Sequence, residues 1–216
     1  DLGTFNKAIE VTDGFIKHSG IRRSTLRNCV IGDDCLIEDV SCINTTPDAS
    51  FGEGCVISVL NEVGDGNVMI FDGLNSQLAA LMVKYEQDRE FTDIVRRLIT
   101  KDIADHSLAV TTIGNNVRIT ATHDITNCHI SDGCIIDGAL RLRDCTLKSI
   151  PSAAVTIGVG VICLNSVIYN GSSITNATKI ENCFVGEACK ISDGFTAENS
   201  LFFANCYMSN GEACRS

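Results

Sequence analysis

Ile180-Glu-Asn-Cys-Phe184, which runs directly into Val185-Gly-Glu-Ala-Cys-Lys-Ile191, is the stretch of the chain that decides its fold. The first block is a pentad with an Asn at its centre, and the second block returns to an aliphatic residue after six positions. Gly and Asn adopt turn conformations that β-branched residues resist. Each block is therefore expected to form one short side of a coil that ends in a tight turn.

Blocks of both kinds recur along most of the chain. The other pentads are Leu26–Val30, Ile125–His129, Leu142–Thr146 and Ala197–Leu201. The other hexads are Ile31–Ile37, Phe51–Ile57, Ile113–Ile119, Ile130–Ile136, Ile157–Cys163, Ile168–Ile174 and Phe202–Met208. Their order predicts a coil of two hexads and one pentad, with a 17-residue register that stacks residues 113, 130 and 147, and likewise 168, 185 and 202. The extra residues between Ser149 and Ala154 are expected to form a loop at one corner.

This register predicts the fold class, which is an all-β solenoid of parallel coils. A single short coil is marginal, so such a fold gains its stability by stacking equivalent side chains. The pairs expected to stack are Asn127 with Asp144, Asn182 with Asn199, Cys128 with Cys145 and Cys189 with Cys206. Aromatic residues make up only 6% of the chain and Trp is absent, which fits a thin core of aliphatic and small residues.

The twelve cysteines follow the repeat and form no C-x-x-C motif or short Cys/His cluster. Nine of them stand two residues before a large apolar residue: Cys29, Cys35, Cys55, Cys128, Cys134, Cys145, Cys183, Cys189 and Cys206. A cysteine placed by a repeat acts as a small hydrophobe. We therefore expect structural thiols in a reducing cytoplasm, with no disulfide framework, no metal site and no cofactor.

The charge pattern limits the partners of the chain. The formal net charge is −10, and no run of Lys or Arg offsets it. Binding a phosphate backbone or an anionic membrane surface needs clustered cations, so neither nucleic acid nor membrane is expected as a partner. No apolar run is long enough to cross a bilayer, which predicts a soluble protein.

One segment breaks the repeat and predicts helices. The apolar residues at helical spacing are Leu78, Leu81, Met82 and Tyr85, followed by Ile94, Val95, Leu98 and Ile99. The expected N-caps are Asn75 or Ser76 for the first helix and Thr92 or Asp93 for the second. The resulting division is N-terminal coils over 1–73, a helical insertion over 74–106 and C-terminal coils over 107–216. The insertion is expected to pack on a flank or an end of the coils, or else to form a subunit contact.

The repeats resemble the hexapeptide-repeat superfamily of left-handed parallel β-helix proteins, and left-handedness is what this resemblance implies. Two regions are similar to a bacterial family of unknown function labelled UDP-N-acetylglucosamine pyrophosphorylase-related protein. They are Val59–Glu62 with Asp72–Leu81, and Phe195–Cys206 with Gly211–Cys214. Because members of that family are longer and the repeat still runs at Cys214-Arg-Ser216, the chain is expected to be a fragment of a longer protein.

The family label does not predict an activity. A sugar-nucleotide pyrophosphorylase needs a basic, Gly-rich phosphate loop at a helix N-terminus, and the chain has no G-x-G-T-R-like segment. The Gly-rich stretch Gly64-Asp-Gly66 is acidic instead. The chain is thus similar to the β-helix appendage that such enzymes carry.

The superfamily resemblance implies acyl transfer in a trimer, where a His takes the proton of an acceptor hydroxyl or amine. Of the four histidines, His129 is expected to point outward and is the first candidate, followed by His123. His18 and His106 show no comparable placement. Two function classes stay open. One is a structural, assembly or ligand-binding scaffold, and the other is an acyl- or nucleotidyltransferase-like enzyme with an intersubunit His and an acyl-CoA or nucleotide-sugar ligand.

Overall fold

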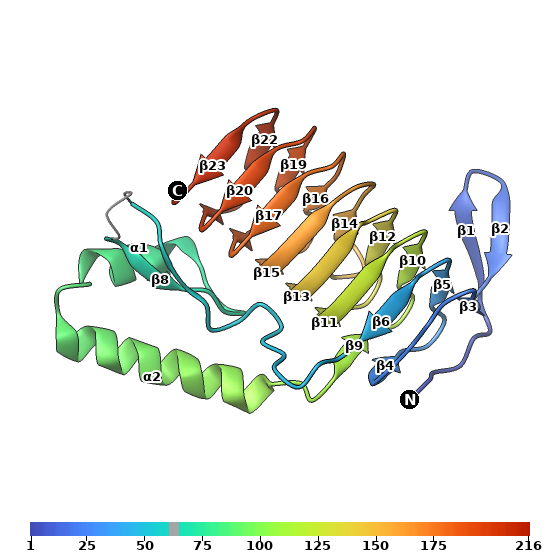
Figure 1. Cartoon of the computed structure of the whole chain (residues 1–216), viewed down its shortest axis with the longest axis horizontal. Helices are drawn as coiled ribbons and strands as arrows, with labels where there is room; N and C mark the ends of the chain where they lie inside the picture. Colours follow the sequence, from blue (N-terminus) through green and yellow to red (C-terminus); the bar gives the residue numbers. More distant parts are fainter. Residues whose placement is uncertain (61–64) are drawn as a thin grey trace.

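The computed structural model describes residues 1–60 and 65–216, and it shows two long parallel sheets flanked on one side by two helices (Figure 1). Asn61, Glu62 and Gly64, which fall in two of the sequence motifs above, lie outside the described residues. In the part of the chain that the structure describes, one sheet has eight strands and the other has eleven, of which eight form its main path. None of the helices found there is long and apolar enough to cross a membrane.

The eight-stranded sheet contains one short strand from each repeat. In spatial order its members are β22 (Tyr207–Ser209), β19 (Lys190–Ser192), β16 (Ser173–Ile174), β14 (Thr156–Ile157), β12 (Ile135–Asp137), β10 (Arg118–Thr120), β5 (Leu36–Glu38) and β3 (Gly20–Arg22). Every neighbouring pair is parallel, and the order follows the sequence except where β5 meets β10 across the insertion.

The eleven-stranded sheet contains the remaining strands of the repeats. Its path runs through β23 (Glu212–Cys214), β20 (Thr196–Glu198), β17 (Lys179–Glu181), β15 (Ile162–Ile168), β13 (Arg141–Leu147), β11 (Asp124–Ile130), β9 (Thr111–Ile113) and β4 (Cys29–Ile31). Beside this path lie β6 (Cys42–Asn44), β18 (Phe184–Val185) and β21 (Leu201–Phe202).

A residue with positive φ bends each of the three long strands in its middle. The residue is Asn127 in β11 (56°), Asp144 in β13 (50°) and Asn165 in β15 (44°). Before the bend, Asp124–Thr126 of β11 pairs with β6, whereas His129–Ile130 after the bend pairs with β9. The eleven-stranded sheet is therefore two rows of strands that meet at a corner, and with the eight-stranded sheet they make three parallel rows.

The strand pairing confirms the predicted 17-residue register. Ile130 pairs with both Ile113 and Leu147, and Val185 pairs with both Ile168 and Phe202. Leu147 pairs with Ile168, a step of 21 residues. The extra residues form the expected loop, which an isolated bridge between Ile150 and Ala153 closes.

The corner is held by hydrogen bonds between stacked side chains, as the sequence predicts. Asn127 donates its Nδ2 to Oδ1 of Asp144 at 3.1 Å. Farther along, Asn165 donates to Asn182 at 3.3 Å and Asn182 donates to Asn199 at 3.2 Å. Asn tolerates positive φ better than other non-Gly residues, and the same side chain then satisfies a neighbour in the stack.

The core within the three rows consists of aliphatic side chains and thiols. Seven of the twelve cysteines are buried: Cys35, Cys128, Cys134, Cys145, Cys163, Cys183 and Cys189. All twelve are free thiols, Cys128 pairs with Cys145 in register, and the pairing of Lys190 with Tyr207 sets Cys189 beside Cys206. Burial raises the pKa of Cys134 to about 12, so this thiol stays protonated and inert.

The insertion is longer than the sequence predicts, and two predictions here are wrong. The hexad Phe51–Ile57 does not join the stack, because β7 (Val56–Ser58) pairs antiparallel with β8 (Asn67–Met69). The N-terminal repeats end at Asn44 rather than residue 73, and the repeat strands resume at Thr111. Ile57 of this hexad packs in a second core, formed with the insertion. The pattern of the hexad alone therefore does not predict that β8 is its pairing strand.

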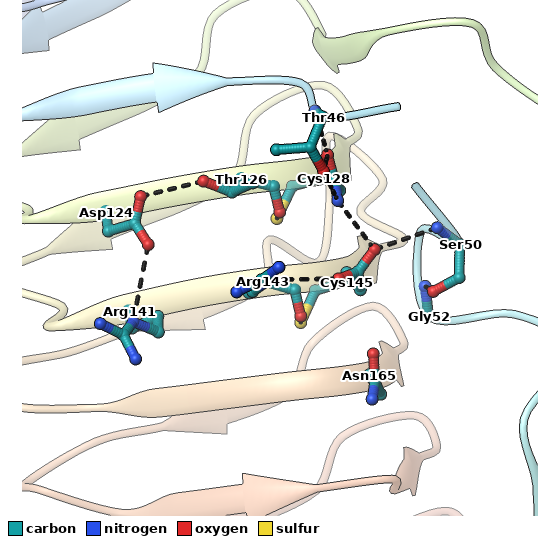
Figure 2. A network of polar contacts seen from close by, with 12 residues as sticks. Thr46, Ser50, Gly52, Asp124, Thr126, Cys128, Arg141, Arg143, Cys145 and Asn165 are labelled. Carbon is teal, nitrogen blue, oxygen red and sulfur yellow. Dashed lines mark hydrogen bonds and ion pairs between the residues drawn. The ribbon is translucent and has the colours of Figure 1, made fainter. Parts of the chain in front are cut away.

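The insertion starts by crossing the corner of the coils. Thr46 and Ser50 donate their backbone N–H groups to the side chains of Asn127 and Asp144 at 2.8 and 3.0 Å (Figure 2). At Gly52 the crossing is so close that a Cβ atom would lie 2.6 Å from the carbonyl oxygen of Ser166. Glycine is therefore needed for two reasons, the close approach and a φ of +84° that other residues rarely adopt.

The two helices of the insertion are α1 (Ser76–Lys84) and α2 (Arg89–His106). Asn75 caps α1 by accepting the N–H of Leu78 at 3.0 Å, which confirms one of the expected caps. The expected caps Thr92 and Asp93 are wrong for α2, because Asp88 accepts the N–H of Phe91 at 3.1 Å. The helix starts earlier because an acidic side chain is available before its apolar residues begin.

A second core joins the insertion to a flank of the coils. Its buried residues are Ile57, Val59, Val68, Ile70, Phe71, Leu74, Ala79, Met82 and Ile99, together with Val167 and Phe184 of the coils. The flank position agrees with one of the expected placements. Of the apolar residues that predicted the helices, Met82 and Ile99 are buried, whereas Leu81 and Leu98 are exposed.

The N-terminal residues form an antiparallel hairpin of β1 (Ala8–Thr12) and β2 (Phe15–His18) beside the first repeat. Before this hairpin, Leu2 bridges Ile31 in parallel and Phe5 packs against the main core. The first residues therefore cover the N-terminal end of the stack.

The corner should be sensitive to backbone conformation. Asn182 has a φ of 52° and bonds to two neighbours in the stack. We expect Asn182→Ala to lower the free energy of unfolding by about 2 kcal/mol, from positive-φ strain and lost hydrogen bonds. Asn182→Gly keeps the conformation accessible and is expected to cost about 1 kcal/mol. Urea unfolding of the three proteins measures both values, and an equal loss for Ala and Gly would contradict the role of the turn.

Candidate functional site

A cavity of about 410 Å³ lies where the insertion meets the coils, a volume within the range of small-molecule sites. Its walls are Ala49, Ser50, Phe51, Glu53, Asp72, Ile103, His106, Ser107, Leu108, His129, Thr146 and Lys148. A second cavity, of about 300 Å³, lies between the β7–β8 hairpin and the two helices, and its walls are about half polar and half apolar. The first cavity is the candidate site because titratable groups of the coils and of the insertion meet there.

His129 reaches this cavity because side chains alternate along β11. Cys128 and Ile130 on either side of it are buried in the core, so His129 points outward. The outward positions stack in one column, which runs from Thr112 through His129 and Thr146 to Val167 and Phe184. The apolar part of this column lies under the second core, and its polar part faces the cavity.

A polar network fixes Asp72 and Lys148 in the cavity wall. Lys148, next to the buried Leu147, forms an ion pair with Asp72 of the insertion. The hydroxyl of Tyr169 donates to Oδ1 of Asp72 at 2.9 Å and accepts the N–H of Gly73 at 2.9 Å. The backbone N–H of Asp72 in turn donates to Oε1 of Glu53 at 2.8 Å. Burial, followed by the charge of Asp72, raises the pKa of Tyr169, so its hydroxyl stays a donor.

The imidazole of His129 is half-buried, and neither of its ring nitrogens has a hydrogen-bond partner among residues 1–60 and 65–216. Burial lowers its pKa, the charge of Lys148 lowers it further, and Asp72 opposes the shift. The ring is therefore neutral at pH 7, with one nitrogen free to accept a proton. Burial and the nearby carboxylate of Asp72 raise the pKa of Glu53.

The other histidines are differently placed. His123 is exposed and precedes β11, so it lies at the other end of the strand from His129 and does not line the cavity. The two sequence candidates are thus not brought together. His106 lines the cavity from the last turn of α2, where its Nδ1 lies 2.9 Å from the carbonyl oxygen of Asp102. His18 is exposed on β2.

Sequence reasoning missed Glu53, Asp72 and Lys148. The position of Lys148 could have been predicted, because it follows Leu147, the last residue of the column through residues 113, 130 and 147, and must lie outside the core. Glu53 sits in a hexad that imitates the repeat, and Asp72 lies in the insertion, so neither has a register position. No group of three or more His, Cys, Asp or Glu side chains in the described ranges is arranged to hold a metal ion. The arrangement can instead bind a hydrogen-bonding ligand and accept a proton from it.

Comparisons with known proteins add one finding. The whole chain, residues 1–216, matches a family described as a domain of unknown function, DUF4954. No curated protein and no solved structure matches the chain.

The lowered pKa of His129 predicts a pH dependence of stability. Below the ordinary histidine pKa of about 6.5 the unfolded state binds a proton that the folded state takes up only at lower pH. The stability contributed by the neutral ring is therefore complete above that pH and falls as the pH drops toward the folded-state value. Urea unfolding at pH 7.5 and pH 5.5 is expected to show a smaller loss in His129→Gln than in the wild type. An equal loss in both proteins would show that His129 is not held in its neutral form.

Proposed function

The chain belongs to the DUF4954 family, a domain of unknown function, and from that premise we propose that it is a β-helical scaffold with a ligand-binding site at His129. The family description assigns no chemistry, so the proposal depends on geometry. The proposal includes the architecture of the scaffold, a closed left-handed parallel β-helix of the hexapeptide-repeat type. The three rows of parallel strands, the 17-residue register and the Asn corner favour a closed parallel coil, and its left hand is what the resemblance to the hexapeptide-repeat superfamily implies. The free thiols favour a reducing cytoplasm.

The observation that carries the ligand-binding function is the state of His129. A histidine that serves only packing is normally satisfied by a hydrogen bond or lies in open solvent. His129 is half-buried, has no partner among the described residues, and borders a cavity with Glu53 and Lys148. Among the described residues only Nη1 of Arg22 is a side-chain N or O atom buried without a partner, so the ring nitrogens of His129 stay accessible to a ligand that enters the cavity.

A second candidate function is group transfer, of the acyl- or nucleotidyltransferase-like type. A neutral imidazole with a free nitrogen is the general base that an acceptor hydroxyl or amine needs. In this chain the groups around His129 come from the coils and the insertion of the same chain, so the site does not require the intersubunit cleft expected from the sequence. Acyl-CoA and nucleotide sugars are the donors to test.

Blocking the cavity tests the ligand-binding proposal. Ser107 is exposed and lines the cavity, so Ser107→Trp is expected to fill it. Thr12→Trp, on the β1–β2 hairpin, is a matched control outside the cavity. In a thermal-shift screen of amines, polyols, acyl-CoAs and nucleotide sugars, at least one class should raise the Tm of the wild type and of Thr12→Trp but not of Ser107→Trp.

Two outcomes of this screen would contradict the proposal. One is the absence of any stabilising compound in the wild type. The other is equal stabilisation of Ser107→Trp, which would place the ligand elsewhere.

The transfer function makes its own prediction. If His129 is the general base, His129→Gln should lower the rate of CoA thiol release from an acyl-CoA, with an amine acceptor present, by about 10²–10⁴-fold. His123→Gln, outside the cavity, is the control and should leave the rate unchanged. A wild-type rate no higher than that of Ser107→Trp would exclude acyl transfer at this site.

A further inference from the structure

Two free hydrogen-bond acceptors face the His129 cavity, one on Glu53 and one on His129. The carboxylate of Glu53 receives one hydrogen bond, from the backbone N–H of Asp72 to Oε1. Its Oε2 has no partner within residues 1–60 and 65–216, and the free ring nitrogen of neutral His129 is also an acceptor. A ligand that pairs with both acceptors must supply donors, while the N–H of the neutral His129 ring stays available to an acceptor of the ligand.

The charge balance of the cavity excludes an anion as the natural fit. The two carboxylates of Glu53 and Asp72 face the single ammonium of Lys148, and that ammonium is already paired with Asp72. With His129 neutral, one negative charge is left uncompensated, and Asp102 on α2 adds to the field at Glu53. A phosphate or carboxylate entering here would meet an occupied cation and an unpaired carboxylate.

The remaining walls define the body of the ligand. Phe51, Ile103 and Leu108 contribute apolar surface, and Thr146 uses its hydroxyl to donate to the carbonyl oxygen of Phe51 at 2.8 Å. A cavity of about 410 Å³ with these walls suits a compact ligand with an apolar or ring-shaped body.

Building on the proposed ligand-binding function, we propose that the cavity takes a compact molecule carrying a primary ammonium group, which pairs with the carboxylate of Glu53. The ammonium supplies the missing charge and up to three N–H donors. His129 accepts a second donor of the ligand, either a further N–H or a hydroxyl. Lys148 and Tyr169 act as positioning residues, because they hold Asp72 and, through its backbone N–H, Oε1 of Glu53.

Three small probes that share one ring test the charge of the ligand. Cyclohexylamine is cationic at pH 7.5, cyclohexanol is neutral and cyclohexanecarboxylate is anionic. In NMR titrations of the whole chain at 150 mM NaCl, we expect the amine to bind at least ~10-fold more tightly than the alcohol, and the carboxylate to bind most weakly. Equal affinities, or a preference for the carboxylate, would overturn the inference.

A matched pair of variants locates the ammonium group. Glu53→Gln keeps the acceptor for the N–H of Asp72 but removes the charge, and it is expected to abolish the preference for the amine. Glu187→Gln removes one charge from an exposed turn outside the cavity, so it controls for the acidity of the whole chain and should leave the preference intact. An unchanged preference in Glu53→Gln would show that the ammonium does not lie at Glu53.

The two proposals fail in different ways. If the Tm screen finds a compound whose effect depends on Ser107, but the probes show no preference for the amine, the site stands and the ammonium assignment falls. If neither the screen nor the probes detect binding that Ser107→Trp removes, the ligand-binding function itself falls.

Discussion

The constraint on which the rest of the structure depends is the positive-φ turn that recurs at one corner of the coils. The chain must turn the corner within a single residue there, and Asn127, Asp144 and Asn165 make the turn with side chains that also bond across the stack. Each turn fixes where the next strand starts, so the register of the following repeat is set by the one before it. A regular stack results because an Asn or Asp returns at this place in most repeats, and a slip of one residue would turn every buried side chain outward.

That regularity positions His129. Its neighbours Cys128 and Ile130 are held inward by the register, and the outward direction of the imidazole follows with no specific contact to hold it. The same column places Phe184 outward farther along the stack, where the insertion covers it. The scaffold thus offers one column with a polar part and an apolar part, and the insertion covers mainly the apolar part.

The repeated part of the molecule could be predicted from sequence because each of its residues appears several times in an equivalent environment. The links through Ile130 and Val185, the Asn corner and the loop after Leu147 all follow from that repetition. The insertion has no such redundancy. Phe51–Ile57 has the residue pattern of a repeat hexad, but its strand β7 pairs with β8. Only tertiary packing decides whether such a hexad joins the stack or the insertion. The same difference applies to the site. The register of the repeat predicts the outward position of His129, whereas Glu53 and Asp72 lie in the insertion and have no register position.

The position of the cavity at the joint of the two cores has a physical reason. The insertion packs its apolar core over Val167 and Phe184, and Thr46 and Ser50 bond it to the corner. Between these attachments the chain spans a polar stretch of the column that offers it no apolar surface to bury. Close packing is therefore not favoured there, and polar groups of both parts face the space that is left. Glu53 and His129 keep unused hydrogen-bonding groups for this reason, because the polar joint leaves both side chains facing the cavity instead of packing them together.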